Sequence, residues 1–379
     1  MSEWPTQTFD SAGIEFIDGD RGKNYPSQDD FHDIGHCLFL STKNVRAYGF
    51  DFNDCQFISV EKDELLRKGK LNRGDIVLTT RGTVGNTAYY NETVQFDHVR
   101  INSGMVIIRM NPLNVDSSFF LYFLRQLDYT SFVSGSAQPQ LPIRDLKQIE
   151  IDLPPLPEQK AIASVLSSLE DKIDLLHCQN KTLEAMAETL FRQWFIEEAK
   201  EDWVQGKVED LFILQRGYDL PSSKRVKGEF PLYAASGLND TINAYQVEYP
   251  TVITGRSGSI GGVYISLEKS WPLNTTLFIK EFKLGTLVFS YFYLKCLDLE
   301  SFNSGSAVPS LNRNHVHGLE IQLPPVHLVQ EYEKIAQDWM LKVKANKHQI
   351  QTLENLRDTL LPKLMSGEVR VQYQTEQVA

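Results

Sequence analysis

Residues 153–176 read LPPLPEQKAIASVLSSLEDKIDLL, and residues 323–325 repeat the opening Leu-Pro-Pro before a second amphipathic stretch. Pro157 suits the first turn of a helix, because its ring fixes φ and its missing N–H would have no partner there. Leucine and isoleucine then recur at alternating steps of four and three, a spacing typical of a helix that packs against another helix. The stretch therefore predicts a long coiled-coil helix.

The apolar seam of this helix continues for about five heptads, and a comparable seam lies near the C-terminus. Asn180 interrupts the first seam, where a polar residue either fixes the register of a helix pair or marks a point of fraying. A single helix packed under a globular domain would need a broader apolar face, so we expect the two helices to pair. The predicted seam residues are Ile162, Leu166, Leu169, Ile173, Leu176, Asn180, Leu183, Leu190, Trp339, Val343, Ile350, Leu353 and Leu360.

The helices belong to a larger internal repeat. Residues 124–155 match residues 294–325 in one constant register without a gap, and residues 82–85 match residues 258–261 further upstream. Runs of β-branched residues at 75–80 and 251–254 predict strands that end in turns. Each copy therefore reads as a strand-rich module followed by a helix. The segments at 16–72 and 215–247 have no clear counterpart in each other.

The repeat divides the chain into four parts and predicts an α+β fold. Two strand-rich modules are expected at residues 1–155 and 201–325, and two long helices at residues 156–200 and 326–379. A length of 379 residues and a hydrophobic fraction of 42% agree with two globular domains. The first residues lack the charged and apolar pattern of a secretory signal, so we expect a soluble cytoplasmic protein.

The amino-acid composition argues against several other classes of function. The net charge of −11 argues against a simple nucleic-acid binder, and acidic residues equal or outnumber basic ones in each of the four parts. The four cysteines form no CxxC pair, which disfavours a zinc ribbon or a disulfide framework. His32, His36 and Cys37 form the one suspicious cluster, and without a matching pair nearby we interpret them as ordinary packing residues rather than as a metal site.

No catalytic motif stands out. An adenine methyltransferase needs a Gly-rich cofactor turn and an Asn/Asp-Pro-Pro-aromatic loop, and a P-loop needs a lysine after its glycines; neither pattern occurs. The glycine-rich segment at residues 255–262 imitates a phosphate cradle but has no following lysine, so we interpret it as a tight turn or as a loop that faces a DNA phosphate. The histidines form no convincing spacing with a serine or cysteine nucleophile.

Taken together, these segments resemble the specificity subunit of type I restriction-modification systems. The resemblance covers nearly the whole chain and rests on the duplicated layout and on residues 134–138, 153–163 and 360–368. It implies two target-recognition domains that each read one half of a bipartite, asymmetric DNA site. It also implies a pseudo-two-fold repeat whose two conserved helices pair antiparallel, as a spacer and as a docking surface for two methyltransferase (modification) subunits. One departure is that the second helix start lacks the third proline and the Glu-Gln pair of the first.

The resemblance further implies that the chemistry lies in other chains. This chain would need no cofactor, whereas S-adenosylmethionine, ATP and magnesium would bind the methyltransferase and restriction (translocase/nuclease) subunits of the full complex. Two other readings are a protein of similar build that serves another machine, such as an anti-restriction or regulatory chain, and a self-sufficient enzyme. Methylation or cleavage by the purified chain alone would favour the last.

Candidate DNA contacts are expected in loops, where polar residues follow the strands. Arginine suits guanine and phosphate, and asparagine suits adenine. For each residue the alternative is a solvated charge or a turn former. The segments at 134–140 and 304–310 match too well between the copies to discriminate two half-sites, so we interpret them as framework. The candidates are Arg21, Lys23, Asn24, Arg81, Thr83, Arg100, Asn102, Arg216, Tyr218, Lys224, Arg225, Lys227, Arg256, Ser257 and Ser259.

Overall fold

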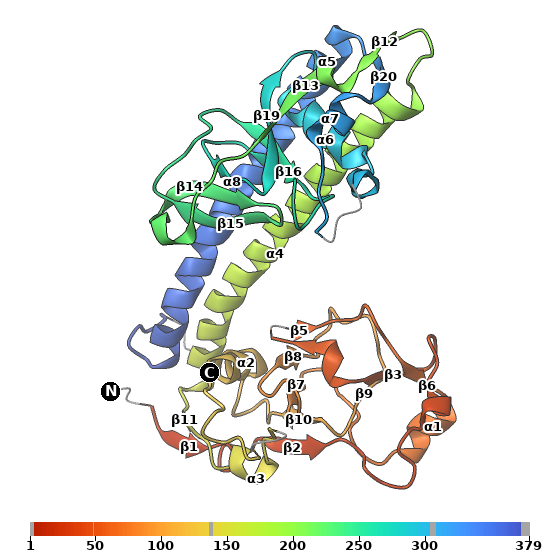
Figure 1. The fold of residues 1–379 in the computed structure, drawn as a ribbon. Helices are drawn as coiled ribbons and strands as arrows, with labels where there is room; N and C mark the ends of the chain where they lie inside the picture. The colour runs from red at the N-terminus through yellow and green to blue at the C-terminus, as the bar shows by residue number, and fades with distance from the viewer. Residues whose placement is uncertain (1–3, 48, 136–138, 304–307, 373–379) are drawn as a thin grey trace. The chain divides into compact units, whose positions relative to one another are not determined.

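The computed structural model describes residues 4–47, 49–135, 139–303 and 308–372. The chain divides into two compact units, one made of residues 1–172 and 353–379 and the other of residues 173–352. Each unit thus combines a module with parts of both long helices (Figure 1). The four-part division by residue number stays a prediction. Within the described ranges, no helix is both long and apolar enough to cross a membrane.

The first unit is built on a four-stranded antiparallel sheet. Its strand order is β2 (Glu15–Asp18), β10 (Met105–Arg109), β7 (Ile76–Thr79) and β8 (Thr87–Tyr89). Alternate side chains of a strand point to opposite faces, so Ile76 and Leu78 pack with helix α2 (Ser117–Gln126), whereas Val77 packs on the other side. Both faces of the central strands are therefore covered.

A second, smaller sheet covers the other face in this unit. It contains β6 (Phe57–Ile58), β3 (Cys37–Leu40) and β9 (Val99–Ile101), with β3 and β9 parallel. Strands β4 (Val45–Arg46) and β5 (Gly49–Phe50) form a short pair, and helix α1 (Val60–Leu65) follows β6. Outside these sheets, β1 (Thr6–Thr8) pairs with β11 (Glu150–Asp152), and α3 (Ile143–Leu146) precedes β11.

The second unit repeats the arrangement. Its four-stranded sheet has the order β13 (Phe212–Arg216), β19 (Thr276–Phe282), β16 (Thr251–Gly255) and β17 (Val263–Ser266). Its second sheet contains β15 (Gly237–Ile242), β14 (Lys227–Ala234) and β18 (Trp271–Pro272), again with one parallel pair, β14 and β18. Helices α5 (Val208–Leu211), α6 (Leu287–Cys296) and α7 (Arg313–His317) complete it, and β12 (Val204–Lys207) pairs with β20 (Glu320–Leu323).

The predicted internal repeat is confirmed by this common strand order. Helices α2 and α6 have ten residues each and occupy equivalent places in the chain. The units differ between the first strand of the large sheet and the parallel partner strand. The first unit places β3 to β6 and α1 in that region, and the second places the β14–β15 hairpin there. These are the segments for which the sequence showed no mutual match.

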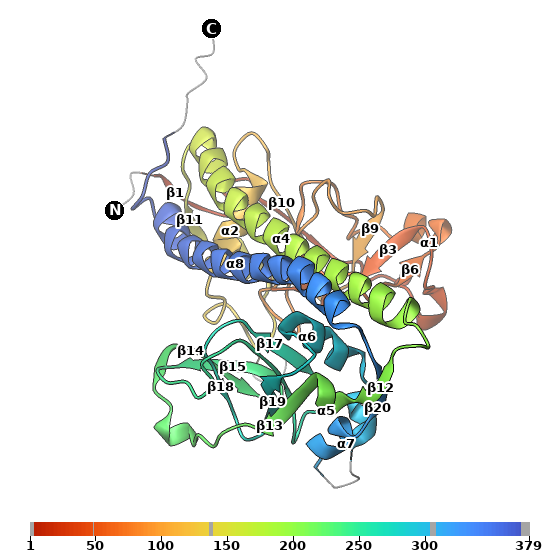
Figure 2. The same ribbon diagram turned by 90° about the horizontal axis from the view of Figure 1, so that it is seen from above.

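The two long helices are α4 (Leu156–Arg192), which continues into a π-helical turn (Gln193–Glu197), and α8 (Val326–Met365). They lie side by side and antiparallel (Figure 2). In the second unit, the hydroxyl of Tyr332 near the start of α8 donates to the carbonyl of Ala187 near the end of α4, at 3.0 Å. In the first unit, Leu364 near the end of α8 shares a core with Ile162 near the start of α4. The antiparallel coiled coil is therefore confirmed.

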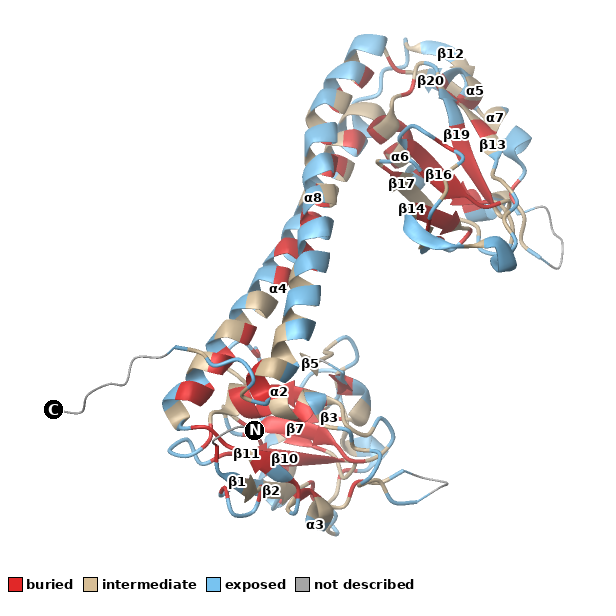
Figure 3. Cartoon of the chain, turned by 90° about the vertical axis from the view of Figure 1, so that its left-hand side faces the viewer, coloured by how far each residue is buried: buried red, intermediate tan, exposed pale blue. Residues whose placement is uncertain are grey.

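The predicted seam positions are buried or half-buried in the two helices. Figure 3 shows buried residues recurring along both helices where they face each other. At one level of α8 the buried residue is Met340, whereas Trp339, which was predicted for the seam, is only half-buried beside it. The seam residues that are buried are Ile162, Leu166, Ile173, Leu176, Asn180, Val343 and Ile350, and those that are half-buried are Leu169, Leu183, Leu190, Leu353 and Leu360.

The two modules are anchored to the helices by different residues. Gln159 is fully buried, accepts a hydrogen bond from the backbone N–H of Asp116 (2.8 Å) ahead of α2, and donates to the carbonyl of Asn114 (2.9 Å). In the second unit, the carboxylate of Glu333 on α8 accepts from the N–H groups of Val288 and Phe289 at the start of α6. Both contacts satisfy orphan donors near a helix N-terminus. Glu333 thus anchors α6 in the second unit, as Gln159 anchors α2 in the first.

An ion pair with a buried carboxylate links residues near both ends of the described chain in the first unit. Glu158 is fully buried, and its carboxylate accepts from Nε of Arg370 at 2.5 Å and from Nη2 at 2.8 Å. The indole N–H of Trp4 donates to the same carboxylate at 3.3 Å. Such a bidentate pair has both strength and directional specificity. The segment after α8 is thereby held against the start of α4.

A buried polar layer interrupts the apolar seam in the second unit. Nδ2 of Asn346 donates to Oδ1 of Asn180 at 2.9 Å and to Oε1 of Gln179 at 2.8 Å. Asn346 is fully buried, and its own Oδ1 has no hydrogen-bond partner in the described part of the chain. Asn180 is therefore not a point of fraying. A buried amide pair disfavours shifted registers, because a shift would leave both amides facing leucine or isoleucine.

Replacing both amides should stabilise the helix pair while loosening its register. We expect Asn180→Leu with Asn346→Leu to raise the free energy of unfolding by about 1–3 kcal/mol, because an incompletely satisfied buried pair becomes apolar. Asn180→Leu alone should lower it by about 1–2 kcal/mol, because Asn346 loses its partner. Urea unfolding of the full chain measures both, with the exposed Gln349→Leu as control. A double variant as unstable as the single one would contradict this account.

A second buried ionic cluster fixes the segment after α1. The carboxylate of Asp63 is almost fully buried. It accepts hydrogen bonds from Nε of Arg100 and from Nζ of Lys70, the latter at 2.5 Å. The guanidinium of Arg100 also donates to the carbonyls of Lys68 (2.7 Å) and Leu66 (3.0 Å). Burial by itself raises the pKa of Asp63, but the bonds from Lys70 and Arg100 outweigh burial and hold it below the usual value of 3.8.

This cluster predicts an acid-sensitive contribution to stability. Because the pKa of Asp63 is depressed in the folded chain, the unfolded chain binds the proton more readily, and the contribution, complete above 3.8, is lost as pH falls from 3.8 through the lower pKa of the folded chain. Asp63→Asn should destabilise the chain by about 3 kcal/mol at neutral pH, since it leaves Arg100 buried without a countercharge. Denaturant unfolding at pH 7 and near pH 3 measures the difference, which should shrink at the lower pH. The exposed Asp33→Asn is the control, and an equal loss in it would refute the assignment.

Candidate nucleic-acid interface

Four loops meet at one end of the large sheet in the first unit. They are the segment after β2, the β7–β8 turn, the β9–β10 turn and the segment around Leu141. The N–H groups of Thr80 and Arg81 both donate to the carbonyl of Gly104, at 2.9 and 3.1 Å, and the N–H of Leu141 donates to the carbonyl of Thr80 at 3.0 Å. Nη2 of Arg21 reaches the carbonyl of Ser103 at 3.4 Å. The structure thus brings loops far apart in sequence into one surface.

The second unit builds the same frame from other side chains. The N–H groups of Arg256 and Ser257 both donate to the carbonyl of Thr275, at 2.8 and 3.1 Å, and the N–H of Leu311 donates to the carbonyl of Arg256 at 2.8 Å. Arg256 therefore occupies the place of Thr80, and Ser257 the place of Arg81. The arginine stands one residue apart in the two frames, so matching backbone hydrogen bonds support different side chains.

Glycines shape the central turn in both frames. Gly82 and Gly85 have φ of 72° and 96°, and Gly258 and Gly261 have φ of 93° and 95°. These left-handed conformations favour glycine, because a side chain would clash with the backbone there. The hydroxyl of Thr79 closes the first turn onto the carbonyl of Thr83. The predicted tight turn at residues 255–262 is confirmed.

The candidates of the first unit fall into two groups. Arg21, Lys23 and Thr83 are exposed, and Arg81 is half-buried at the loop surface. The remaining three have structural roles. Asn24 donates from Nδ2 to the carbonyl of Leu65, and Asn102 accepts from the N–H of Gly104 at 2.9 Å. Arg100 was wrongly predicted as a DNA contact, because its guanidinium is buried and bound to Asp63 and backbone carbonyls.

The candidates of the second unit divide in the same way. Arg225 donates to the carbonyl of Leu220 at 3.2 Å, and the ring of Tyr218 packs against Phe278 with centroids 5.8 Å apart. Nη1 of Arg256 donates to the carbonyl of Asn274 at 3.3 Å, which holds it within the loop frame. Ser257 is half-buried within this frame. The exposed candidates are Arg216, Lys224, Lys227 and Ser259.

The sequence interpretation missed Arg67 and Lys68, which lie beside the loop after β2 and are exposed. The signal that could have found them is an adjacent basic pair followed by Gly69. Of the segments interpreted as framework, residues 136–138 and 304–307 lie outside the described residues. Of the suspected His-Cys cluster, Cys37 is buried with Phe39 in a small core, whereas His32 and His36 are exposed.

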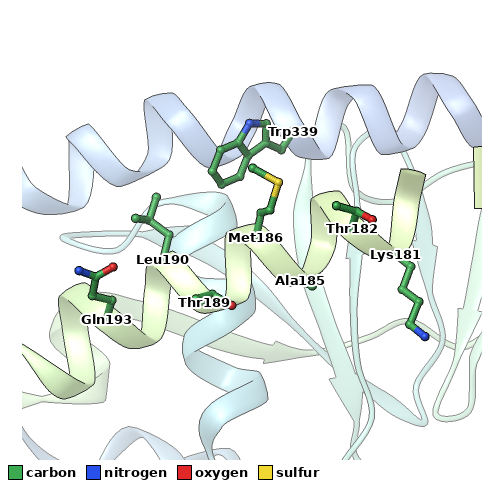
Figure 4. A pocket seen from close by; sticks show the side chains of 8 residues that line it. All are labelled: Lys181, Thr182, Ala185, Met186, Thr189, Leu190, Gln193 and Trp339. Atoms are coloured by element: carbon green, nitrogen blue, oxygen red, sulfur yellow. The ribbon is translucent and has the colours of Figure 1, made fainter. Parts of the chain in front are cut away.

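A second feature is an apolar groove on the paired helices of the second unit. Its volume is about 540 Å³, and side chains of α4 together with Trp339 of α8 form it (Figure 4). Met186 points toward the Trp339 ring and is 44% exposed. Exposed methionine beside an aromatic ring is typical of adaptable protein-binding surfaces. The lining residues are Lys181, Thr182, Ala185, Met186, Thr189, Leu190, Gln193 and Trp339.

The repeat places comparable residues on the helices of the first unit. In the register that aligns the two Leu-Pro-Pro segments, Met186 corresponds to Leu356 and Trp339 to Leu169. Leu356 is 43% exposed, close to the value for Met186, and Leu169 is half-buried like Trp339. Each unit thus carries an exposed apolar side chain at the same position of the repeat.

Comparisons with known proteins agree with this architecture. The family model described as "Type I restriction modification DNA specificity domain" matches twice, at residues 16–185 and 200–355. The chain is 28% identical over 327 residues to the type I restriction enzyme MjaIX specificity subunit of Methanocaldococcus jannaschii, covering 71% of this chain and 76% of the relative. It is 24% identical over 365 residues to a putative MjaX specificity subunit of the same organism, covering 85% and 84%.

A solved structure has the same fold. The type I restriction-modification S subunit from M. genitalium superposes with a TM-score of 0.69 at 18% identity, covering 96% of each chain. The two family matches span most of the chain and coincide with the two repeats that the fold displays. The chain therefore belongs to the type I restriction modification DNA specificity family, the specificity subunits of type I restriction-modification systems.

Proposed function

We propose that each module reads one half of a bipartite, asymmetric DNA site and that the paired helices set the spacing and dock two methyltransferase subunits. The observation that carries this proposal is the pair of loop frames. Identical backbone hydrogen bonds support Thr80 and Arg81 in one frame and Arg256 and Ser257 in the other. Base specificity depends on which donors and acceptors a loop presents. Two frames of one shape with different side chains suit two different half-sites.

The chain itself would carry out no reaction. Adenine methylation would take place in the modification subunits, which would bind S-adenosylmethionine, and ATP and magnesium would serve the restriction subunits. The net charge of −11 fits a chain that encloses DNA only together with partners. The partners would supply much of the basic surface, so the isolated chain should bind DNA weakly at physiological salt.

The helix groove supports the docking role. Met186 and Trp339 form an apolar surface rimmed by Lys181 and Gln193, which is the composition of a protein interface with a buried centre and a polar edge. Leu356 repeats the exposed position of Met186 on the other unit. Two equivalent apolar positions suit two copies of one partner. We therefore propose one methyltransferase subunit on each.

Sequencing of methylated DNA tests the proposed recognition. Cells that express this chain with its modification subunits should carry methyladenine at one motif made of two unlike halves separated by a fixed gap. Arg256→Lys keeps the charge but loses both the planar guanidinium and its bond to the carbonyl of Asn274, which orients that group, so this variant should relax one half of the motif and leave the other unchanged. The equivalent control is Thr80→Ser, which keeps a hydroxyl at the matching position. Methylation by the purified chain alone, or a motif with a single half, would refute the proposal.

Charge placed in the groove should separate the partners from the chain. Met186→Glu should weaken binding of one methyltransferase subunit by about 2–4 kcal/mol, because a carboxylate would be buried without a partner in the interface. Leu356→Glu should weaken the other, and the double variant both. Native mass spectrometry of the co-expressed complex counts the bound subunits. Leu113→Glu, at a side chain that is 80% exposed in a loop, is the matched control. Full occupancy in the double variant would disprove docking at this surface.

A further inference from the structure

The segment that follows α1 forms a basic hollow with the loop after β2. Residues 18–22, Arg67 and Lys68 line a concavity of about 500 Å³. Lys68 and Arg67 are exposed, and so is Lys23 at the edge of the same loop. None of the sequence motifs had assigned a role to residues 67 and 68. The hollow is continuous with the loop frame, because Arg21 reaches the carbonyl of Ser103.

Asp20 locks the two sides of this hollow together. Its carboxylate is almost fully buried and accepts from the backbone N–H of Gly22 and from that of Arg67, both at 2.7 Å. The hydrogen bond from Gly22 is the largest of the effects that lower the pKa of Asp20, so the group stays ionised. A charged acceptor with two backbone donors is a strong restraint on both loops. Arg67 and Arg21 are thereby presented from fixed backbones.

The negative charges in the hollow are already engaged. Asp18 pairs with Nη2 of Arg21 at 3.1 Å, and Asp20 is occupied by backbone N–H groups. A Cβ atom added to Gly22 would lie 3.0 Å from Nη2 of Arg67, so the Arg67 guanidinium lies directly over the Gly22 backbone. Arg67 and Lys68 line the hollow and are exposed, and neither forms an ion pair with another described residue. Cations at the rim of a fixed concavity suit a phosphate group.

We propose that Arg67 and Lys68 bind the DNA backbone beside the half-site read by the first unit, with Asp20 as the residue that positions them. This inference rests on the proposed function, since it names the phosphate contact of the same interface. The contact would set register and orientation without reading bases. It would also give the acidic chain a local basic surface of its own.

The salt dependence of DNA binding tests this proposal. The assay uses the complex of the full chain with its modification subunits, on a duplex with the mapped motif and on a scrambled duplex. Arg67→Gln with Lys68→Gln should weaken binding to both by about tenfold and reduce the slope of log K against log salt by about 2, since each phosphate contact adds about 0.9. The methylation motif should stay unchanged.

The matched control removes two cations at the other ends of the sheets. Lys147 pairs with Asp10 ahead of β2, and Lys283 follows β19 at the end away from Thr275. Lys147→Gln with Lys283→Gln should leave the slope within error of the parent complex. An unchanged slope in the Arg67 and Lys68 variant, or an altered motif, would overturn the inference. Failure of the parent complex to methylate a bipartite motif would instead overturn the proposed function.

Discussion

The packing of α4 against α8 is the interaction on which the rest of the structure depends. Each helix has a narrow apolar seam, and such a helix gains its stability from a partner rather than from its own backbone. The seam also completes the modules. Leu364 and Met365 at the end of α8 lie in the core that contains Phe119 and Phe120 of α2, and Ala336 and Met340 lie in the core around Phe289. The core of each module therefore includes residues of the long helices.

Much of the fold could be predicted from the sequence, because the spacing of apolar residues indicates which positions are buried. The seam positions Ile162, Leu166 and Ile173 recur at helical spacing, and all three are buried. Strands such as residues 76–79 were visible as β-branched runs between turns. Internal similarity supplied the domain organisation without any knowledge of a fold. These features are local, or repeat a local pattern.

The candidate site was harder to predict, because side-chain roles depend on contacts between distant segments. In the sequence, Arg100 is an arginine two residues before an asparagine. Only the fold shows that Asp63, from a segment without a match in the other copy, binds it in the interior. Arg67 is the opposite case, because its side chain is exposed while its backbone N–H donates to Asp20, a residue far away in the sequence. Trp339 was placed in the seam because apolar character alone does not distinguish it from Met340.

The two copies show which constraints a duplicated fold must keep. The backbone frame of the loops is the same in both, down to the paired N–H donors on Gly104 and Thr275, whereas the side chains on it differ. The contacts that anchor the modules to the long helices differ as well. The amide of Gln159 on α4 accepts from a backbone N–H at the start of α2, whereas the carboxylate of Glu333 on α8 accepts from one at the start of α6. What has to be conserved between the copies is therefore a satisfied hydrogen-bonding requirement, not a particular residue.

The same argument applies to the middle of the helix pair. A symmetric, wholly apolar seam would tolerate a shift by one heptad, because leucine or isoleucine would still face an apolar partner. Asn180 and Asn346 remove that freedom, since each amide finds a polar partner in only one register. Their equivalents in the repeat, Ile350 and Leu176, are apolar and buried. The polar layer therefore makes the two halves of the seam chemically unequal, and it selects one register in a chain whose halves are otherwise built alike.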